Sequence, residues 1–182
     1  MKHRISEDLD FFIEHEEVNS AHIARFFKLQ SQALLIKNIE TRIVFGLFTY
    51  FLNFHDGSSL KIDFNYYPFP RIKKGLKYGN LEIESMYDIS VDKVHTIALK
   101  PRARDFIDLY FIIKNQNFTF RRLLSDAKAK FDWDISPIEL GTRLLDASKL
   151  IDYPRMIKKI NHREWQNFFI EQAMDLKKDI FF

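Results

Sequence analysis

The sequence contains no cysteine, only five glycines and no long apolar run. The absence of cysteine excludes disulfide bonds, thiolate zinc sites and cysteine nucleophiles. No apolar stretch approaches the roughly 20 residues that a membrane-spanning helix needs, and no apolar signal region follows Met1. We therefore expect a soluble, cytoplasmic protein.

The composition is that of an ordinary globular chain. With 182 residues, 46% of them apolar and 15% aromatic, it can bury a substantial core in one α/β domain with a helical extension. The net charge of +3 is compatible with a nucleic acid partner, and equally with a solvated surface of mixed charge. The six histidines show no spacing typical of a zinc site.

The segment RISEDLDFF places two aspartates one residue apart among apolar residues. If it is a strand, Arg4, Ser6, Asp8 and Asp10 share one face, since successive side chains alternate. Two carboxylates a few Å apart repel by about 1 kcal/mol in water, and by more when they are partly dry. The pair therefore indicates either a bound divalent cation or a solvated strand face.

Three further elements follow in the first half of the chain. Asn19 or Ser20 is expected to cap a helix, and the segment 41–54 is rich in the β-branched and aromatic residues of a strand. The dipeptide DG at 56–57 predicts a hairpin that returns as LKIDFNYYPF. In that strand Asp63 falls on the polar face, which by itself favours an exposed residue.

The second half of the chain is mainly helical. After a basic loop and a short strand, LEIES, either Asp88 or Ser90 is expected to cap a helix that ends at Leu99, before a proline. Arg104, Asp105 and Asp108 have the spacing that brings side chains together on the next helix. Four helices are expected beyond Pro101, at 103–115, 119–131, 137–150 and 162–178.

Three of these segments, in this order and at these intervals, resemble one known family. RISEDLDFF, LKIDF and DISVDKVHTIALKPRARDFIDLYFI are together similar to the AbiEii/AbiGii toxin family of nucleotidyltransferases. The resemblance covers roughly residues 4–113. It implies an α/β (α+β) fold of the DNA polymerase β type, with a small mixed β-sheet, flanking helices and a C-terminal helical region. We expect a sheet core in residues 1–86 and a helical region in 87–182, packed as one unit.

The resemblance also implies residue roles. Asp8 and Asp10 match the paired metal-binding acids, and Asp63 matches the third carboxylate on a neighbouring strand. Two Mg²⁺ ions would bridge these acids and the triphosphate of an NTP, and Asp63 would help to deprotonate the acceptor hydroxyl. Lys93 matches a lysine that contacts the triphosphate.

The remaining matches flank these residues. Two lie just before the acid pair, and three form an R-D-x-x-D motif, which is either a salt-bridge lock or a substrate contact. These residues are Arg4, Ser6, Arg104, Asp105 and Asp108.

One part of the family pattern is missing. Relatives carry a Gly-Gly-Ser or Gly-Gly-Thr turn before the acid pair, whose backbone N–H groups cradle phosphate. All five glycines here follow Asp10, and no Gly-Gly occurs. We therefore expect an N-terminally truncated relative, a decayed relative, or one whose first segment is supplied in trans. An uncovered sheet edge would favour self-association.

Two functions remain open at this stage. The family implies transfer of a nucleoside monophosphate from a Mg²⁺-bound NTP to an acceptor, tRNA in some members, in a toxin–antitoxin or phage-defence system with a cognate antitoxin. The alternative is a catalytically inactive remnant that binds RNA or a protein partner. Metal-dependent NTP binding distinguishes the two.

Overall fold

The computed structural model describes residues 2–179, which form two compact units. One unit is the continuous segment Ser6–Phe69. The other combines the N-terminal residues up to Ile5 with the chain from Pro70 onward. The division in the chain thus falls after Phe69, whereas the sequence predicted a sheet core extending to residue 86.

The Ser6–Phe69 unit is a mixed four-stranded sheet with one helix, which agrees with the small mixed sheet that the family resemblance implies. The strand order is β1-β4-β3-β2, with β1 parallel to β4 and the other neighbours antiparallel. The helix begins where expected, because the Asn19 side chain accepts a hydrogen bond from the backbone N–H of His22. The elements are β1 (Asp8–Ile13), α1 (Ser20–Gln30), β2 (Ile36–Val44), β3 (Leu47–Phe54) and β4 (Ser59–Tyr66).

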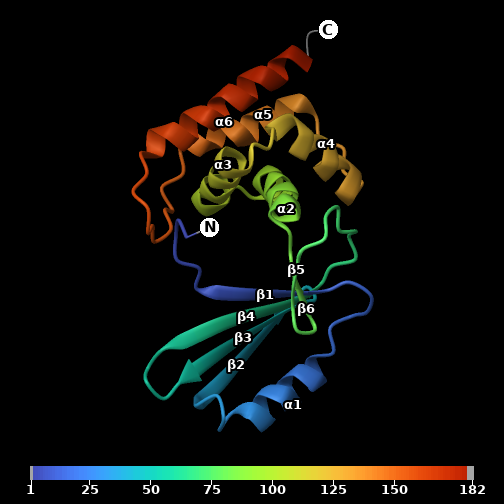
Figure 1. Cartoon of the computed structure of the whole chain (residues 1–182), viewed down its shortest axis with the longest axis vertical. Helices are drawn as coiled ribbons and strands as arrows, with labels where there is room; N and C mark the ends of the chain where they lie inside the picture. Colours follow the sequence, from blue (N-terminus) through green and yellow to red (C-terminus); the bar gives the residue numbers. More distant parts are fainter. Residues whose placement is uncertain (1, 180–182) are drawn as a thin grey trace. The chain divides into compact units, whose positions relative to one another are not determined.

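Helix α1 covers one face of this sheet (Figure 1). Phe27 of the helix is buried against side chains from three strands, and its ring lies 5.3 Å from that of Tyr50. Ile36, Leu52 and Ile62 complete this small core. Since side chains alternate along a strand, the polar residues between these positions lie on the opposite face.

The strands differ from the sequence interpretation in two ways. The alternation considered for RISEDLDFF applies only from Asp8 onward, because Arg4 instead forms an isolated antiparallel bridge with Met156 of the helical unit. The segment 41–54 contains two strands, not one. Phe45 and Gly46 form the turn between them with positive φ angles of 47° and 79°, the combination that a tight hairpin turn requires.

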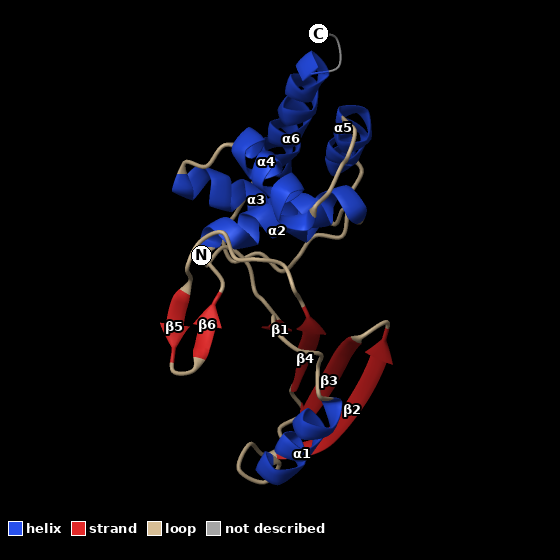
Figure 2. Cartoon of the chain, turned by 90° about the vertical axis from the view of Figure 1, so that its right-hand side faces the viewer, coloured by secondary structure: helices blue, strands red, loops and turns tan. Residues whose placement is uncertain are grey.

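The second unit consists of a small hairpin and a helical bundle (Figure 2). Both strands of the hairpin are exposed, whereas the helices bury a common core. The elements are β5 (Leu76–Tyr78), β6 (Leu81–Ile83), α2 (Met86–Leu99), α3 (Ala103–Gln116), α4 (Phe120–Phe131), α5 (Pro137–Leu145) and α6 (His162–Leu176), with short 3-10 helices at Asp146–Ser148 and Lys177–Asp179.

The helical core is built around large side chains that are fully buried. Phe106 of α3 packs against Trp165 and Phe169 of α6, with ring centroids 5.9 and 4.8 Å away. Leu123 of α4 and Val94 of α2 are also buried in this core. α2 begins a turn earlier than expected, because its cap is Ser85, whose hydroxyl accepts a hydrogen bond from the N–H of Asp88.

Within residues 2–179, the helices are too short or too polar to cross a lipid bilayer.

Candidate functional site

The register between β1 and β4 brings the acidic residues of both strands onto one face of the sheet. Asp10 lies directly beside Asp63, and Asp8 lies beside Lys61. Side chains in register on neighbouring strands point to the same side, so these four residues share a face. That face is opposite the one covered by α1, because Ile62, which alternates with Lys61 and Asp63, is part of the core under the helix.

Asp63 has two hydrogen-bonded partners within its own unit. The Thr49 hydroxyl donates to Oδ1 at 2.6 Å, and the Lys61 ammonium pairs with Oδ2. Asp63 is 8% exposed, so the expectation of an exposed residue was wrong. Alternation places a residue on the polar face, but it does not show that Thr49 of β3 and Lys61 enclose the carboxylate there.

The acid pair at the start of β1, Asp8 and Asp10, is more exposed to solvent than Asp63. Asp10 is exposed and Asp8 half-buried, with Ser6 Oγ at 3.4 Å from Asp8 Oδ1. Across residues 2–179 no three histidine, aspartate or glutamate side chains gather closely enough to form a ready-made metal cluster. The donor chemistry nevertheless fits Mg²⁺, which prefers carboxylate oxygens, and the Lys61 ammonium shows that this face already holds a cation against Asp63.

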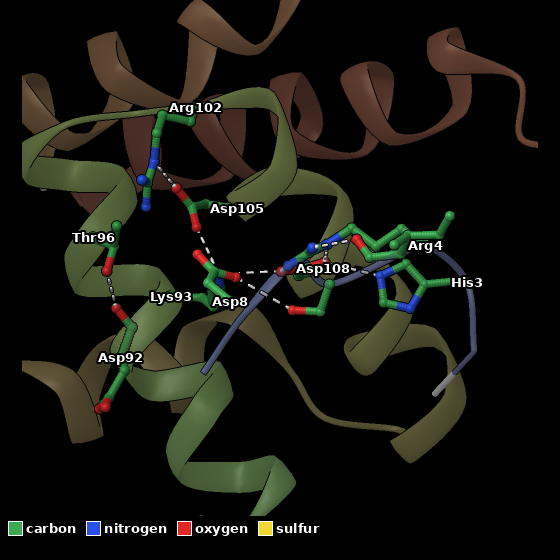
Figure 3. Close-up of polar contacts among 11 residues, drawn as sticks. His3, Arg4, Asp8, Asp92, Lys93, Thr96, Arg102, Asp105 and Asp108 are labelled. Atoms are coloured by element: carbon green, nitrogen blue, oxygen red, sulfur yellow. Dashed lines mark hydrogen bonds and ion pairs between the residues drawn. The ribbon is translucent and has the colours of Figure 1, made fainter. Parts of the chain in front are cut away.

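A second charged cluster lies in the helical unit and joins α2 to α3 (Figure 3). The ammonium of Lys93 lies 2.6 Å from Asp105 Oδ1 and 3.1 Å from Asp108 Oδ2. Asp105 is fully buried, and its other oxygen accepts a hydrogen bond from Arg102 at 2.7 Å. Both acids of the R-D-x-x-D motif are therefore bound to Lys93, the lysine that the family resemblance singles out.

Asp108 also ties the N-terminal residues to the helical unit. The Arg4 guanidinium donates to both of its oxygens, at 2.6 and 2.7 Å, and His3 Nε2 lies 2.9 Å away (Figure 3). Burial opposes ionisation of this carboxyl, but the hydrogen bonds from Arg4 and His3, together with the Lys93 charge, hold its pKa well below the usual range. Asp108 is therefore a stable anion.

The Lys93 cluster, which we define as Arg4, Lys93, Arg102, Asp105 and Asp108, carries more positive than negative charge. Its three basic side chains face two carboxylates, and the Lys93 side chain remains 21% exposed. The sequence indicated the two acids and Lys93. It gave no indication of the Arg4 contact, which spans 104 positions in the chain. Arg104, the remaining motif residue, is half-buried on α3.

Sequence reasoning also missed a buried lysine on α4. The Lys130 side chain is 1% exposed, and its ammonium lies 2.7 Å from Asp92, 3.4 Å from Asp88 and 3.8 Å from Glu84. Burial, followed by the neighbouring Asp92 carboxylate, raises the pKa of Glu84 to about 8. Three acids and one lysine thus connect the end of the small hairpin with α2 and α4.

The chain matches one described protein family. Residues 1–179 match the family described as the nucleotidyl transferase AbiEii toxin of type IV toxin–antitoxin systems. No curated protein matches the chain significantly.

Solved structures give the same fold. The crystal structure of JHP933 from Helicobacter pylori is 18% identical, with a TM-score of 0.53 over 97% of this chain and 77% of that one. A second H. pylori structure, described as that of a "putative nucleotidyltransferase", is 18% identical, with a TM-score of 0.54 over 97% and 80% of the two chains. The expected α/β fold with C-terminal helices is therefore confirmed, and the family match over nearly the whole chain shows that this protein belongs to the AbiEii nucleotidyltransferase toxin family.

Proposed function

We propose that this chain is a Mg²⁺-dependent nucleotidyltransferase that transfers a nucleoside monophosphate from an NTP to a hydroxyl group of an RNA acceptor. The observation that carries the proposal is the register of β1 and β4. It places Asp10 beside Asp63, with Asp8 on the same face, in a chain of a nucleotidyltransferase family. Three carboxylates on one sheet face are the donor set that this chemistry needs.

The three acids would hold the metal, and their neighbours would orient them. Mg²⁺, when bound, supplies positive charge that offsets the charge developing on the transferring phosphoryl group. The Thr49 hydroxyl donates a hydrogen bond to one oxygen of Asp63 and thereby fixes the orientation of the carboxylate. In this proposal Asp63 also accepts the proton of the attacking hydroxyl, and Ser6 orients Asp8.

We propose that the Lys93 cluster supplies charge for phosphate binding. The excess of cations over carboxylates, with Lys93 partly exposed, supports this role. Asp105 and Asp108 then act as positioning residues that fix the lysine, and Arg4 is an anchor for the N-terminal segment rather than a nucleotide ligand. We also propose Arg104 as a substrate contact, because it is the arginine of the R-D-x-x-D motif.

The partners follow from the family. A type IV toxin functions with a cognate antitoxin, and an NTP is the expected nucleotide substrate. tRNA is the acceptor class that we propose to test first. Self-association through an open sheet edge stays a prediction, and its best candidate is β2, an edge strand of the described sheet that ends in the exposed residues Ile43 and Val44, followed by exposed Phe45 in the turn.

Calorimetric titration of each NTP in the presence of Mg²⁺ tests the proposal. We expect saturable binding by the unaltered chain, weakened at least about tenfold in Asp10→Asn, because one of three metal-binding carboxylates is lost. Asp134→Asn, the same chemical change at an exposed loop position, is the matched control and should bind normally. RNA binding that needs no metal and survives in Asp10→Asn, with no NTP binding, would instead support the non-catalytic binding module.

A further inference from the structure

Lys61 occupies a singular position on the acidic face. It precedes Asp63 by two residues on β4, so the two side chains lie on the same side, and it lies in register with Asp8 of β1. Its ammonium pairs with Oδ2 of Asp63, while Thr49 binds the other oxygen. The only basic residue of β4 is thus placed among the three acids that we assign to the metal.

The Lys61–Asp63 pair offsets unfavourable electrostatics at Asp63 in the metal-free protein. Asp63 is 8% exposed and lies beside Asp10, so its negative charge is poorly solvated and faces a second one. An ammonium against Oδ2 offsets both effects. It also creates a conflict, since a divalent cation and an ammonium cannot share one carboxylate oxygen without strong mutual repulsion.

We propose that Lys61 is a placeholder cation that neutralises Asp63 while the metal is absent and is displaced from it when Mg²⁺ binds. The inference rests on the proposed function, because that assigns Asp63 to the metal. Under it, the Lys61–Asp63 pair and the metal compete for the same carboxylate. Metal affinity is therefore lower than the three acids alone would give, and the acidic face stays ordered without metal.

A purely structural ion pair would behave differently. In that case removal of the lysine charge lowers the stability of the protein equally with and without metal. If Lys61 is a placeholder, removal of its charge instead lowers the stability of the metal-free protein and leaves the metal-bound protein comparatively more stable. The two roles are distinguished by metal affinity and by the change in melting temperature that metal produces.

The test compares Lys61→Met, which removes the charge but keeps an extended apolar side chain, with Lys61→Arg, which retains it. Mg²⁺ and Mn²⁺ are titrated into each variant without nucleotide, and melting is followed in chelator and in excess Mg²⁺. We expect Lys61→Met to bind metal on the order of tenfold more tightly than the unaltered chain. It should melt at a lower temperature in chelator, and its melting temperature should rise more when Mg²⁺ is added. Lys61→Arg should bind no more tightly than the unaltered chain.

Lys37→Met is the matched control, because it removes the same charge at an exposed position of β2 in the same unit. The inference is overturned if Lys61→Met binds metal no more tightly than this control. If the unaltered chain still binds metal and Asp10→Asn does not, the proposed function survives that result. If no folded variant binds metal at all, both the inference and the proposed function fail.

Discussion

Asp108 and Glu84 are carboxyl groups of one unit whose surroundings favour opposite protonation states. Arg4, His3 and Lys93 keep Asp108 ionised, whereas burial and Asp92 raise the pKa of Glu84 to about 8. The contacts of Asp108 could not be predicted from sequence, because helical spacing relates residues three or four apart while Arg4 lies 104 positions away. Long-range ion pairs of this kind depend on the tertiary fold.

Replacement of Asp108 should destabilise the helical unit. Asp108→Asn removes the charge that faces Arg4 and Lys93, and we expect a loss of about 3 kcal/mol in the free energy of unfolding. Urea denaturation followed by circular dichroism measures it. Asp175→Asn, which disrupts exposed ion pairs with Arg121 and Lys178, should leave that free energy essentially unchanged. Equal stability of the two variants would refute a structural role for Asp108.

Glu84 should make stability depend on pH near neutrality. Its folded pKa lies above the ordinary glutamate value of 4.5, so its contribution to stability is complete below pH 4.5 and is lost as pH rises toward about 8. The loss is at most about 1.4 kcal/mol per pH unit in this window. Asp88, Asp92 and Lys130 surround the group, and none of them is changed in the test variant.

Glu84→Gln should therefore flatten the stability profile between pH 5 and 8. Urea denaturation at several pH values measures the free energy of unfolding of this variant and of Glu171→Gln, which alters an exposed residue on α6. We expect that only Glu84→Gln loses the decline in stability with rising pH. Parallel profiles for the two variants would show that Glu84 is ionised in the folded protein.

At the scale of elements, periodicity and turn chemistry predicted most of the helices and strands, but not their exact limits. The predicted start of α2 was too late in the chain. Ser85, Asp88 and Ser90 are all good N-cap residues, and only the structure shows that Ser85 is used. The register of β1 with β4 also could not be predicted from periodicity. Alternation puts Asp10 on a polar face, but parallel pairing with a strand some 50 residues later decides that it lies beside Asp63.

The β5–β6 hairpin depends on a glycine that no other residue can replace without movement. A Cβ atom at Gly75 would lie 1.7 Å from the carbonyl oxygen of Ile83. We expect Gly75→Ala to lower the free energy of unfolding by at least about 1 kcal/mol, and to speed amide hydrogen exchange in β5 and β6.

Gly141→Ala provides the comparison, since a Cβ atom at this position in α5 meets nothing within 4 Å. Alanine favours helix there by up to about 1 kcal/mol. Hydrogen exchange followed by mass spectrometry and urea denaturation should thus move the two variants in opposite directions. Similar stability and similar exchange in the hairpin would contradict the packing inferred for Gly75.

At the scale of the whole molecule, the chain separates the two groups of matched residues between its units. The acids Asp8, Asp10 and Asp63 belong to the sheet unit, and the Lys93 cluster to the helical unit. Each group is organised within its own unit by register or by ion pairs. The family match spans both units.

An assay of nucleotide transfer tests the proposed activity directly. The full chain is incubated with Mg²⁺, total tRNA and each NTP labelled at the α-phosphate, and label in the RNA is measured for the unaltered chain, Asp10→Asn and Asp134→Asn. We expect transfer by the unaltered chain and by Asp134→Asn, and a rate at least about a hundredfold lower in Asp10→Asn, since several kcal/mol of transition-state stabilisation are lost with the metal. Label transfer that is equal in all three, or absent from all three with every NTP, would contradict the proposed activity.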